Sequence, residues 1–187
     1  ETPLEETMGT LADIVRQGKA LYVGLSNYSR QEAEKAVLLL KDMGIHCLIE
    51  QPRYNMFERT PEDGLFKAMW EHGVGCICYS PLAQGALTDK YLNGIPQGSR
   101  ASRVGSTIND RYLSEEKLDQ IRRLSEIASG RNQSLAQMAL AWVLREKAVT
   151  SVLIGASSVK QLENSVHCLD NLEFSAEELK TIDEILK

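Results

Sequence analysis

Long hydrophobic runs are absent from this sequence. No stretch of its 187 residues approaches the roughly 18 consecutive apolar residues of a membrane helix, and no secretory hydrophobic segment opens it. An excess of positive charge is also absent, because 21 Lys and Arg residues against 26 Asp and Glu residues give a net charge of −5. We therefore expect a cytoplasmic protein with no membrane or nucleic-acid partner, although a local basic patch could still hold phosphate groups.

Cysteine is scarce and scattered. Cys47, Cys76, Cys78 and Cys168 lack the C-x-x-C spacing of a zinc site, so we expect no metal site. Three of them lie in apolar runs, where cysteine behaves as a small hydrophobic residue. We interpret all four as reduced structural thiols.

Two common phosphate-binding motifs are also missing. No G-x-G-x-x-G follows a strand-like run and no Walker A run is present, which excludes the usual Rossmann and P-loop signatures. The chain is 43% hydrophobic and 25% charged, an ordinary balance for a globular protein. Its length is sufficient for one domain with a real core, so we predict a single domain over 1–187.

What the sequence does contain is a regular alternation of strand-like and helical segments. Apolar runs predict strands at 20–25, 47–51, 74–79 and 151–155, each buried on both faces. Capping signals and helical spacing predict helices over 3–17, 30–43, 61–72, 114–128 and near 159–169, one that begins after Ser134 and a final one that begins after Ser175. This alternation is typical of parallel strands with right-handed crossovers. Four strands are half of an eight-stranded barrel, so we predict an α/β fold, half of a (β/α)8 TIM barrel.

Helix boundaries carry their own signals. Thr2 is the expected N-cap of the first helix, and Pro3 is expected at its first helical position. Trp70 is expected on the inward face of the third. The irregular segment 82–109 is rich in Gly, Ser and Arg, and loops of this length are often functional lids.

Each predicted strand ends in a small polar cluster. These ends are Ser26-Asn27, Gln51-Pro52, Tyr79-Ser80-Pro81 and Gly155-Ala156-Ser157. In α/β folds the ligand lies at the carboxyl ends of parallel strands. The four clusters therefore predict one binding site.

Each cluster also has a structural interpretation. Ser26 and Asn27 could simply end a strand, but beside Gln51 and Tyr79 we favour the binding of a carboxamide. Tyr79 could be core packing or a stacking platform. Lys90, Arg100 and Arg103 could be solvated charges or a phosphate clamp; we favour the clamp for Arg100 and leave Arg103 open. Residues 155–158 could be an anion site or only an N-cap.

Four other ionisable residues receive no functional role. His46, His72 and His167 lie at or beside helix ends and not at the carboxyl ends of strands. Glu50 is expected to face the helices, where it would need a partner such as an arginine.

Several ordered blocks resemble the aldo-keto reductase family. They are Gly18-Lys-Ala-Leu-Tyr-Val-Gly24-Leu-Ser26-Asn27, Gln51-Pro-Arg-Tyr54-Asn55, Tyr79-Ser-Pro-Leu-Ala-Gln-Gly85-Ala-Leu-Thr-Asp-Lys90-Tyr, and Ile154-Gly-Ala-Ser157 with Gln161. They span nearly the whole chain and correspond to the fifth to eighth strands of the family's barrel, so the resemblance implies that the chain is the C-terminal half of a (β/α)8 TIM barrel. Within the family they are most similar to the bacterial branch that reduces L-glyceraldehyde 3-phosphate and methylglyoxal. That branch is close to the β subunits of voltage-gated potassium channels.

The resemblance implies a (β/α)8 barrel that binds NADP(H) and reduces small aldehydes or ketones. The family holds the nicotinamide carboxamide at the positions of Ser26, Asn27 and Gln51, and it stacks the ring on an aromatic at that of Tyr79. The pyrophosphate would be wrapped by the 82–109 cofactor-covering loop and the turn before it. The residues implied there are Ser80, Pro81, Leu82, Gln84, Gly85 and Lys90. Those implied at the adenosine phosphate and ribose are Arg100, Gly155, Ser157 and Gln161.

Two departures from the family pattern bear on function. Asn164 and Ser165 stand where the family usually has an acidic residue followed by Asn at the adenine. In addition, the family's catalytic Asp, Tyr, Lys and His match no position here. The resemblance thus implies no catalytic residue in this chain and predicts that it is inactive by itself.

The missing catalytic residues imply a missing N-terminal half-barrel as partner. The opening residue Glu1 likewise leads us to expect a preceding segment. An alternative is an NADP(H)-binding regulatory subunit with little turnover, resembling the potassium-channel β subunits. A third interpretation is an autonomous half-barrel that forms a homo-oligomer edge to edge.

Overall fold

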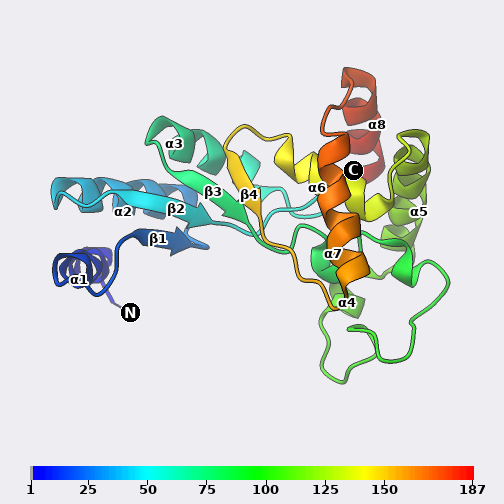
Figure 1. Ribbon diagram of the computed structural model, residues 1–187, viewed down its shortest axis with the longest axis horizontal. Helices are drawn as coiled ribbons and strands as arrows, with labels where there is room; N and C mark the ends of the chain where they lie inside the picture. Colours follow the sequence, from blue (N-terminus) through cyan, green and yellow to red (C-terminus); the bar gives the residue numbers. More distant parts are fainter. Residues whose placement is uncertain (1) are drawn as a thin grey trace. The chain divides into compact units, whose positions relative to one another are not determined.

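Residues 2–187 of the chain are described by a computed structural model, in which strands and helices alternate (Figure 1). The strands are β1 (Val23–Ser26), β2 (Cys47–Gln51), β3 (Gly75–Cys78) and β4 (Val149–Val152). The α-helices are α1 (Leu4–Arg16), α2 (Arg30–Asp42), α3 (Leu65–Glu71), α4 (Ile108–Tyr112), α5 (Glu115–Gly130), α6 (Leu135–Leu144), α7 (Val159–Val166) and α8 (Ala176–Leu186). Short 3-10 helices are η1 (Thr60–Glu62), η2 (Ala83–Gly85), η3 (Asp89–Tyr91) and η4 (His167–Asp170).

The chain folds into two compact units. The first contains the described residues up to Tyr54, then Arg59–Tyr79 and Lys147–Ser151. The second contains Asn55–Glu58, Ser80–Glu146 and Val152–Lys187. The expectation of a single domain stays a prediction.

The first unit is built on the sheet, whose strands lie side by side in the order β1-β2-β3-β4 (Figure 1). Pairing of β1 with β2 and of β2 with β3 is parallel, as predicted. Helices α1, α2 and α3 each pack on the strand that follows them. In β1, Val23 and Leu25 are buried whereas Gly24 and Ser26 are exposed. The prediction of burial on both faces is therefore wrong for β1, because helices of the described chain cover only one face.

Gly24 shows how tightly β1 and β2 approach each other. A Cβ atom added at Gly24 would lie 2.6 Å from Cγ1 of Ile49 on β2. Such a contact is well inside van der Waals distance, so the register requires a residue without a side chain at this position.

Capping side chains place most helix starts where the sequence indicated. Ser29 and Glu32 form a capping box at α2, Ser134 and Gln137 form another at α6, and Ser175 begins α8 in the same way with Glu178. At α1 the prediction is wrong, because the N-cap is Pro3 and no side chain caps the helix.

The segment after Arg59 differs from the single predicted helix. It divides into η1 and α3 at Gly64, whose φ of +102° is a left-handed conformation that glycine adopts readily. Trp70 on α3 is 64% exposed, so its expected place on the inward face is wrong.

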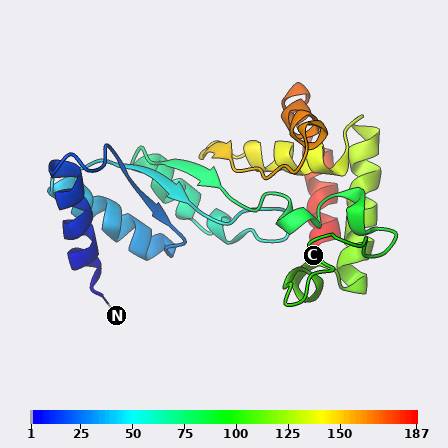
Figure 2. The same cartoon turned by 60° about the horizontal axis from the view of Figure 1, so that its bottom comes forward.

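The second unit is a cluster of helices. Helix α5 contacts α6 and α8, and α6 contacts α7; α5 and α8 run side by side in both views (Figure 2). On α6, the apolar residues Leu135, Met138 and Trp142 are fully buried. No helix among residues 2–187 combines the length and apolar character needed to cross a membrane.

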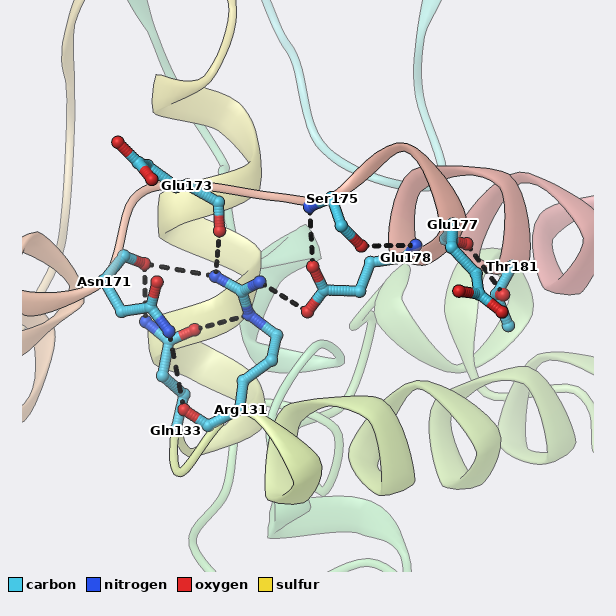
Figure 3. Close-up of polar contacts among 8 residues, drawn as sticks. All are labelled: Arg131, Gln133, Asn171, Glu173, Ser175, Glu177, Glu178 and Thr181. Atoms are coloured by element: carbon cyan, nitrogen blue, oxygen red, sulfur yellow. Dashed lines mark hydrogen bonds and ion pairs between the residues drawn. The ribbon is translucent and has the colours of Figure 1, made fainter.

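Arg131 fixes the C-terminal helix within this unit (Figure 3). Its guanidinium donates to Glu178 Oε1 at 2.7 Å, to the main-chain oxygen of Glu173 at 2.9 Å and to Gln133 Oε1 at 2.9 Å. It also lies over the Phe174 ring, 3.8 Å from the centroid. The Arg131 side chain is 4% exposed, and its charge is offset by the Glu178 carboxylate and by oriented carbonyl groups.

Burial raises the pKa of Glu178, but the hydrogen bonds that it accepts from Ser175 and Arg131 outweigh that effect and leave the pKa below its usual value. The carboxylate therefore stays charged opposite Arg131 at neutral pH.

Candidate functional site

In the first unit the polar residues predicted at the strand ends lie together. Ser26 ends β1 directly beside Gln51 at the end of β2. The Ser26 hydroxyl donates a hydrogen bond of 2.9 Å to the Gln51 main-chain oxygen. The Gln51 side-chain amide forms no hydrogen bond with any residue that the structure describes, so its donors and acceptor remain available to a ligand.

Asn27 and Tyr79 complete this group, which we call the strand-end cluster (Ser26, Asn27, Gln51 and Tyr79). Asn27 has a φ of +60°, a left-handed conformation that Asn tolerates better than most residues. Its amide nitrogen donates to Ser26 Oγ at 3.2 Å, and its amide oxygen accepts from the Tyr79 hydroxyl at 2.9 Å. The strand ends thus present amides and hydroxyls in a fixed arrangement.

The Tyr79 ring is half-buried and has a cationic neighbour. The Arg53 guanidinium lies over the ring, 5.2 Å from its centroid, and Arg53 Nε donates to the Tyr79 hydroxyl at 3.2 Å. A planar ligand group could therefore stack only on the other face of the ring.

The second unit contains a cavity of about 1160 Å³, somewhat larger than most small-molecule sites. All of the binding residues predicted in this part of the sequence line it. They are Ser80, Pro81, Leu82, Gln84, Gly85, Lys90, Arg100, Gly155, Ser157, Gln161, Asn164 and Ser165. The structure thus brings together residues from two segments that lie about 70 positions apart in the chain.

The cavity wall also includes residues that we left open or missed. Arg103, which the sequence did not decide, lines the wall, as do Lys160, Ser134 and Thr88. The helix-starting signal at Ser134 could not indicate this role, because nothing in a capping box shows what lies beyond the helix end. Lys160 carried no signal, since an isolated lysine is normally a solvated surface charge.

Positive charge dominates the wall. Lys90, Arg100, Arg103 and Lys160 line it, against one carboxylate at Asp89. In a chain of net charge −5, this local excess favours a ligand with several negative charges, such as one carrying phosphate groups.

The beginning of α7 adds oriented polar groups. Ser158 caps the helix by accepting from the Gln161 main-chain N–H. The Gln161 side-chain oxygen accepts from both the N–H and the hydroxyl of Ser157, at 2.9 and 3.0 Å. Because both bonds occupy that oxygen, the Gln161 amide nitrogen is the group left to donate to a ligand. Ser158 is thus an N-cap and Ser157 lines the cavity; an anion site at 155–158 stays a prediction.

Asn164 and Ser165, the departures from the family pattern, are held by neighbours. Asn164 Oδ1 accepts from Gln137 Nε2 at 3.1 Å, and Asn164 Nδ2 donates to Ser134 Oγ at 3.3 Å. The Ser165 hydroxyl donates to the Gln161 main-chain oxygen at 2.9 Å. At Asn164 an N–H remains free, so it presents a donor to the cavity.

The turn that opens the cavity wall is conformationally unusual. Ser80, Ala83, Gln84 and Gly85 have φ values of +54°, +47°, +60° and +101°. Each such conformation costs a residue with a side chain on the order of 1–2 kcal/mol. The N–H groups of Ala83 and Gly85 donate to the main-chain oxygens of Ser80 and Leu82, at 2.9 and 2.8 Å, and these hydrogen bonds hold the turn in its unusual conformation.

Glu50 lies beneath the strand-end cluster, on β2 next to Gln51. It is 0% exposed, and neither carboxyl oxygen has a hydrogen-bond partner among the described residues. Burial raises its pKa to about 7; the N–H groups of Asn27 and Tyr28 favour the charged form without forming normal hydrogen bonds. The expected arginine partner is wrong, because neither carboxyl oxygen has a partner among the described residues. With its raised pKa the carboxyl group stays neutral up to a higher pH than an exposed glutamate does, which lowers the cost of its burial.

The thiols are buried and free, in agreement with a structural role. Burial, and then the neighbouring Glu50 charge, raises the pKa of Cys47 to about 11, so this thiol is a poor nucleophile. His72 and His167 lie at the ends of α3 and α7, and pair with Glu34 and Asp170 at 3.5 and 2.8 Å.

Comparison with known proteins matches residues 1–187 to the aldo/keto reductase family. The L-glyceraldehyde 3-phosphate reductase of Escherichia coli K12 is 51% identical over 187 residues, which cover 98% of this chain and 54% of the relative. A putative voltage-gated potassium channel subunit beta of Schizosaccharomyces pombe is 35% identical, with 98% of this chain and 55% of the relative covered. The chain therefore spans about half the length of these relatives.

The fold comparison agrees with the sequence comparison. A glycerol dehydrogenase from Gluconobacter oxydans matches with a TM-score of 0.80 and 25% identity, over 99% of this chain and 54% of that chain. The parallel α/β arrangement is thus that of part of an aldo-keto reductase barrel, as predicted. Because the family model matches the chain from residue 1 to residue 187, the chain belongs to the aldo/keto reductase family.

Proposed function

We propose that this chain is the cofactor-holding part of an NADP(H)-dependent reductase that acts on a small aldehyde or ketone. The observation that carries the proposal is the basic cavity of the second unit, which is lined by every binding residue predicted there. NADP(H) carries a pyrophosphate and a 2′-phosphate, and these charges match the excess of cations on the wall.

The cavity supplies suitable groups for the phosphate-bearing end of the cofactor. Arg100 and Arg103 can contact phosphate oxygens through paired N–H groups, whereas Lys90 and Lys160 act as point charges. The Gln161 amide nitrogen and the start of α7 add neutral donors. The adenine base of the cofactor would meet the side-chain N–H donor of Asn164 at the position where the family usually has a carboxylate.

The strand-end cluster suits the nicotinamide end. A carboxamide needs a donor and an acceptor opposite it, and the amides of Asn27 and Gln51 offer both. Ser26 and Tyr79 hold Asn27 in one orientation through their hydrogen bonds. When bound, the cofactor would supply hydride to the carbonyl carbon; the residues of this chain orient its ring.

We place the proton donor in the portion of the relatives that this chain does not span. Further polypeptide is also supported by α7, whose apolar residues Val159, Leu162 and Val166 are 71%, 47% and 53% exposed. A stripe of this kind on one helix is typical of a surface that packs against another element. A missing half-barrel is the occupant that we propose; association into a homo-oligomer stays a prediction.

For the substrate we propose L-glyceraldehyde 3-phosphate or a related small carbonyl compound, such as methylglyoxal. The support is the 51% identity with the E. coli reductase. Relatedness to the S. pombe channel subunit supports a second candidate function, an NADP(H)-binding sensor with little turnover.

Steady-state assays of the full-length protein, including the portion in which we place the proton donor, separate the two candidate functions. NADPH oxidation is followed at 340 nm with L-glyceraldehyde 3-phosphate, methylglyoxal and a no-carbonyl control. The reductase requires a substrate-dependent rate that saturates. Tight NADPH binding, with oxidation no faster than in the control for every carbonyl compound, would favour the sensor instead.

Arg100→Ala tests the cofactor assignment directly. Loss of a charge opposite the 2′-phosphate should weaken NADPH binding about tenfold or more, and NADH binding much less. Equal weakening for both cofactors would contradict contact between Arg100 and the 2′-phosphate. Arg123→Ala, on the exposed side of α5, is the matched control.

A further inference from the structure

A short turn in the second unit contacts both ends of the loop that forms most of the cavity wall. The turn is Asn55–Glu58, closed by main-chain hydrogen bonds of 3.2 and 3.0 Å in both directions between its end residues. The Asn55 side-chain oxygen accepts from the N–H groups of Phe57 and Glu58, at 2.9 and 3.1 Å. With Asn55 fully buried and Met56 1% exposed, the turn is a firm support.

The first contact is at the beginning of the loop, which we define as residues 80–112. Asn55 Nδ2 donates to the main-chain oxygen of Ser80 at 3.0 Å. That oxygen also accepts from the N–H of Ala83 at 2.9 Å, so it closes the left-handed turn that opens the cavity wall. Asn55 therefore holds in place the Ser80 main-chain oxygen, whose hydrogen bond with Ala83 closes the strained turn.

The second contact is at the end of the loop. Glu58 Oε2 accepts from the Tyr112 hydroxyl at 2.5 Å, and Glu58 Oε1 is paired with Arg111. The Phe57 ring stacks on the Tyr112 ring, with centroids 6.1 Å apart and an interplanar angle of 24°. The Glu58 side chain is only 18% exposed, where a charge-assisted hydrogen bond is stronger than at a free surface.

The hydrogen bonds of the residues between these contacts are formed mainly within the loop. Asn109 donates to the Ala101 main-chain oxygen at 2.9 Å, and Ser102 donates to that of Ser99 at 2.9 Å. Outside the loop, Ser125 on α5 donates to Asp89 at 3.1 Å. Arg100 and Arg103 are exposed on this middle part, so their positions at the cavity depend on how its two ends are held.

We propose that Asn55 and Glu58 are positioning residues that anchor both ends of the 80–112 loop and thereby limit how fast the cavity's ligand leaves. Neither residue lines the cavity, so both act through the loop. The inference rests on the proposed function only in taking NADPH as the ligand. The anchoring itself can be tested without any ligand.

Glu58→Gln removes the charge that pairs with Arg111 while keeping the size of the side chain. The chain offers a close control in Glu62, which accepts from the Tyr54 hydroxyl at 2.6 Å and pairs with Arg59 at 2.7 Å. Glu62 belongs to the first unit. Glu62→Gln therefore removes a carboxylate of the same kind, paired with a tyrosine and an arginine, from the first unit. Tyr112→Phe removes the Glu58–Tyr112 bond from the other side, in case Glu58→Gln fails to fold.

Trypsin cleavage of the ligand-free protein at Arg100 and Arg103 reports loop opening. Stopped-flow measurement of NADPH dissociation reports ligand release. We expect Glu58→Gln and Tyr112→Phe to raise the cleavage rate and the dissociation rate about tenfold, and Glu62→Gln to change neither. Melting temperatures identify any variant whose faster cleavage follows from a general loss of stability.

The possible results separate the two proposals. If cleavage at Arg100 and Arg103 is no faster in Glu58→Gln and Tyr112→Phe than in Glu62→Gln, the anchoring inference is wrong. Unchanged NADPH dissociation in variants that bind NADPH would overturn the limit on ligand release. If cleavage accelerates but no form of the protein binds NADPH, the anchor stands and the proposed function fails.

Discussion

The Tyr79 hydroxyl donates a hydrogen bond of 2.9 Å to the Asn27 side-chain oxygen. This bond links the residue after β3 to the residue after β1, across the end of β2. Because its oxygen is engaged by Tyr79 and its nitrogen donates to Ser26, the Asn27 amide has one orientation and one N–H left for a ligand. Tyr79 thus has a second role beside that of a ring on which a ligand could stack.

Substitutions at Tyr79 should separate these two roles. Tyr79→Phe keeps the ring but releases Asn27, and we expect NADPH binding to weaken roughly two- to tenfold, the usual worth of one hydrogen bond. Tyr79→Leu also removes the ring and should weaken binding further. Isothermal titration of NADPH measures both, with Tyr22→Phe at a 67% exposed tyrosine as control. Equal affinity in Tyr79→Phe and wild type would mean that Asn27 needs no support from the hydroxyl.

The Arg131 network predicts a large stability effect. Arg131→Met removes one donor each from the Glu178 carboxylate and from the carbonyl groups of Asn171 and Glu173. We expect the free energy of unfolding to fall by about 3 kcal/mol, as for other broken buried ion pairs. Urea denaturation gives this value. Arg123→Met removes an exposed arginine from the same helix and should change stability by less than about 0.5 kcal/mol. Similar losses in both variants would contradict a special role for the buried network.

Local signals in the sequence predicted most of the fold. The capping boxes at Ser29, Ser134 and Ser175 fix helix starts because both partners lie within four residues. Less local features were harder to place. The strand predicted at 151–155 lies instead at Val149–Val152, because an apolar run does not show which of its residues pair with a neighbouring strand.

The site was predictable to a similar extent. Polar residues at strand ends and the resemblance to a family identified the residues that line the cavity. The anchors behind them were not visible, because Glu58 and Arg111 are separated by 53 positions and no local pattern connects them. Asn164 is another example, since its bond to Gln137 spans 27 positions. Long-range side-chain pairs require the fold before they can be recognised.

The close approach of β1 and β2 at Gly24 predicts a steric effect. Gly24→Ala would place a Cβ atom 2.6 Å from Ile49 Cγ1, and we expect a loss of about 1–3 kcal/mol in the free energy of unfolding. Ile49→Ala in the same molecule removes the clashing atoms and should make the further cost of Gly24→Ala small. Gly9→Ala in α1 is the control, because nothing lies within 4 Å of its added Cβ and alanine favours helix. If the double variant lost as much stability as the two single variants added together, the clash would not be with Ile49.

Glu50 predicts a pH dependence with a definite sign. Burial raises its pKa in the folded protein to about 7 from 4.5, so the folded state holds the proton more tightly than the unfolded state does. The contribution of the bound Glu50 proton to the free energy of unfolding is therefore complete below pH 4.5. It declines as the pH rises to about 7 and then stays constant. This difference between the folded and unfolded pKa of Glu50 corresponds to about 3 kcal/mol in the free energy of unfolding.

Glu50→Gln cannot ionise and should lack this decline. Relative to wild type, the free energy of unfolding of Glu50→Gln should therefore increase by about 3 kcal/mol between pH 4.5 and 7, as measured by urea denaturation at several pH values. The direction of this change is specific, because a carboxylate stabilised by an ion pair would give the opposite trend. A constant difference between the two proteins across this range would mean that Glu50 titrates alike in the folded and unfolded states, and that its buried position is reached by water.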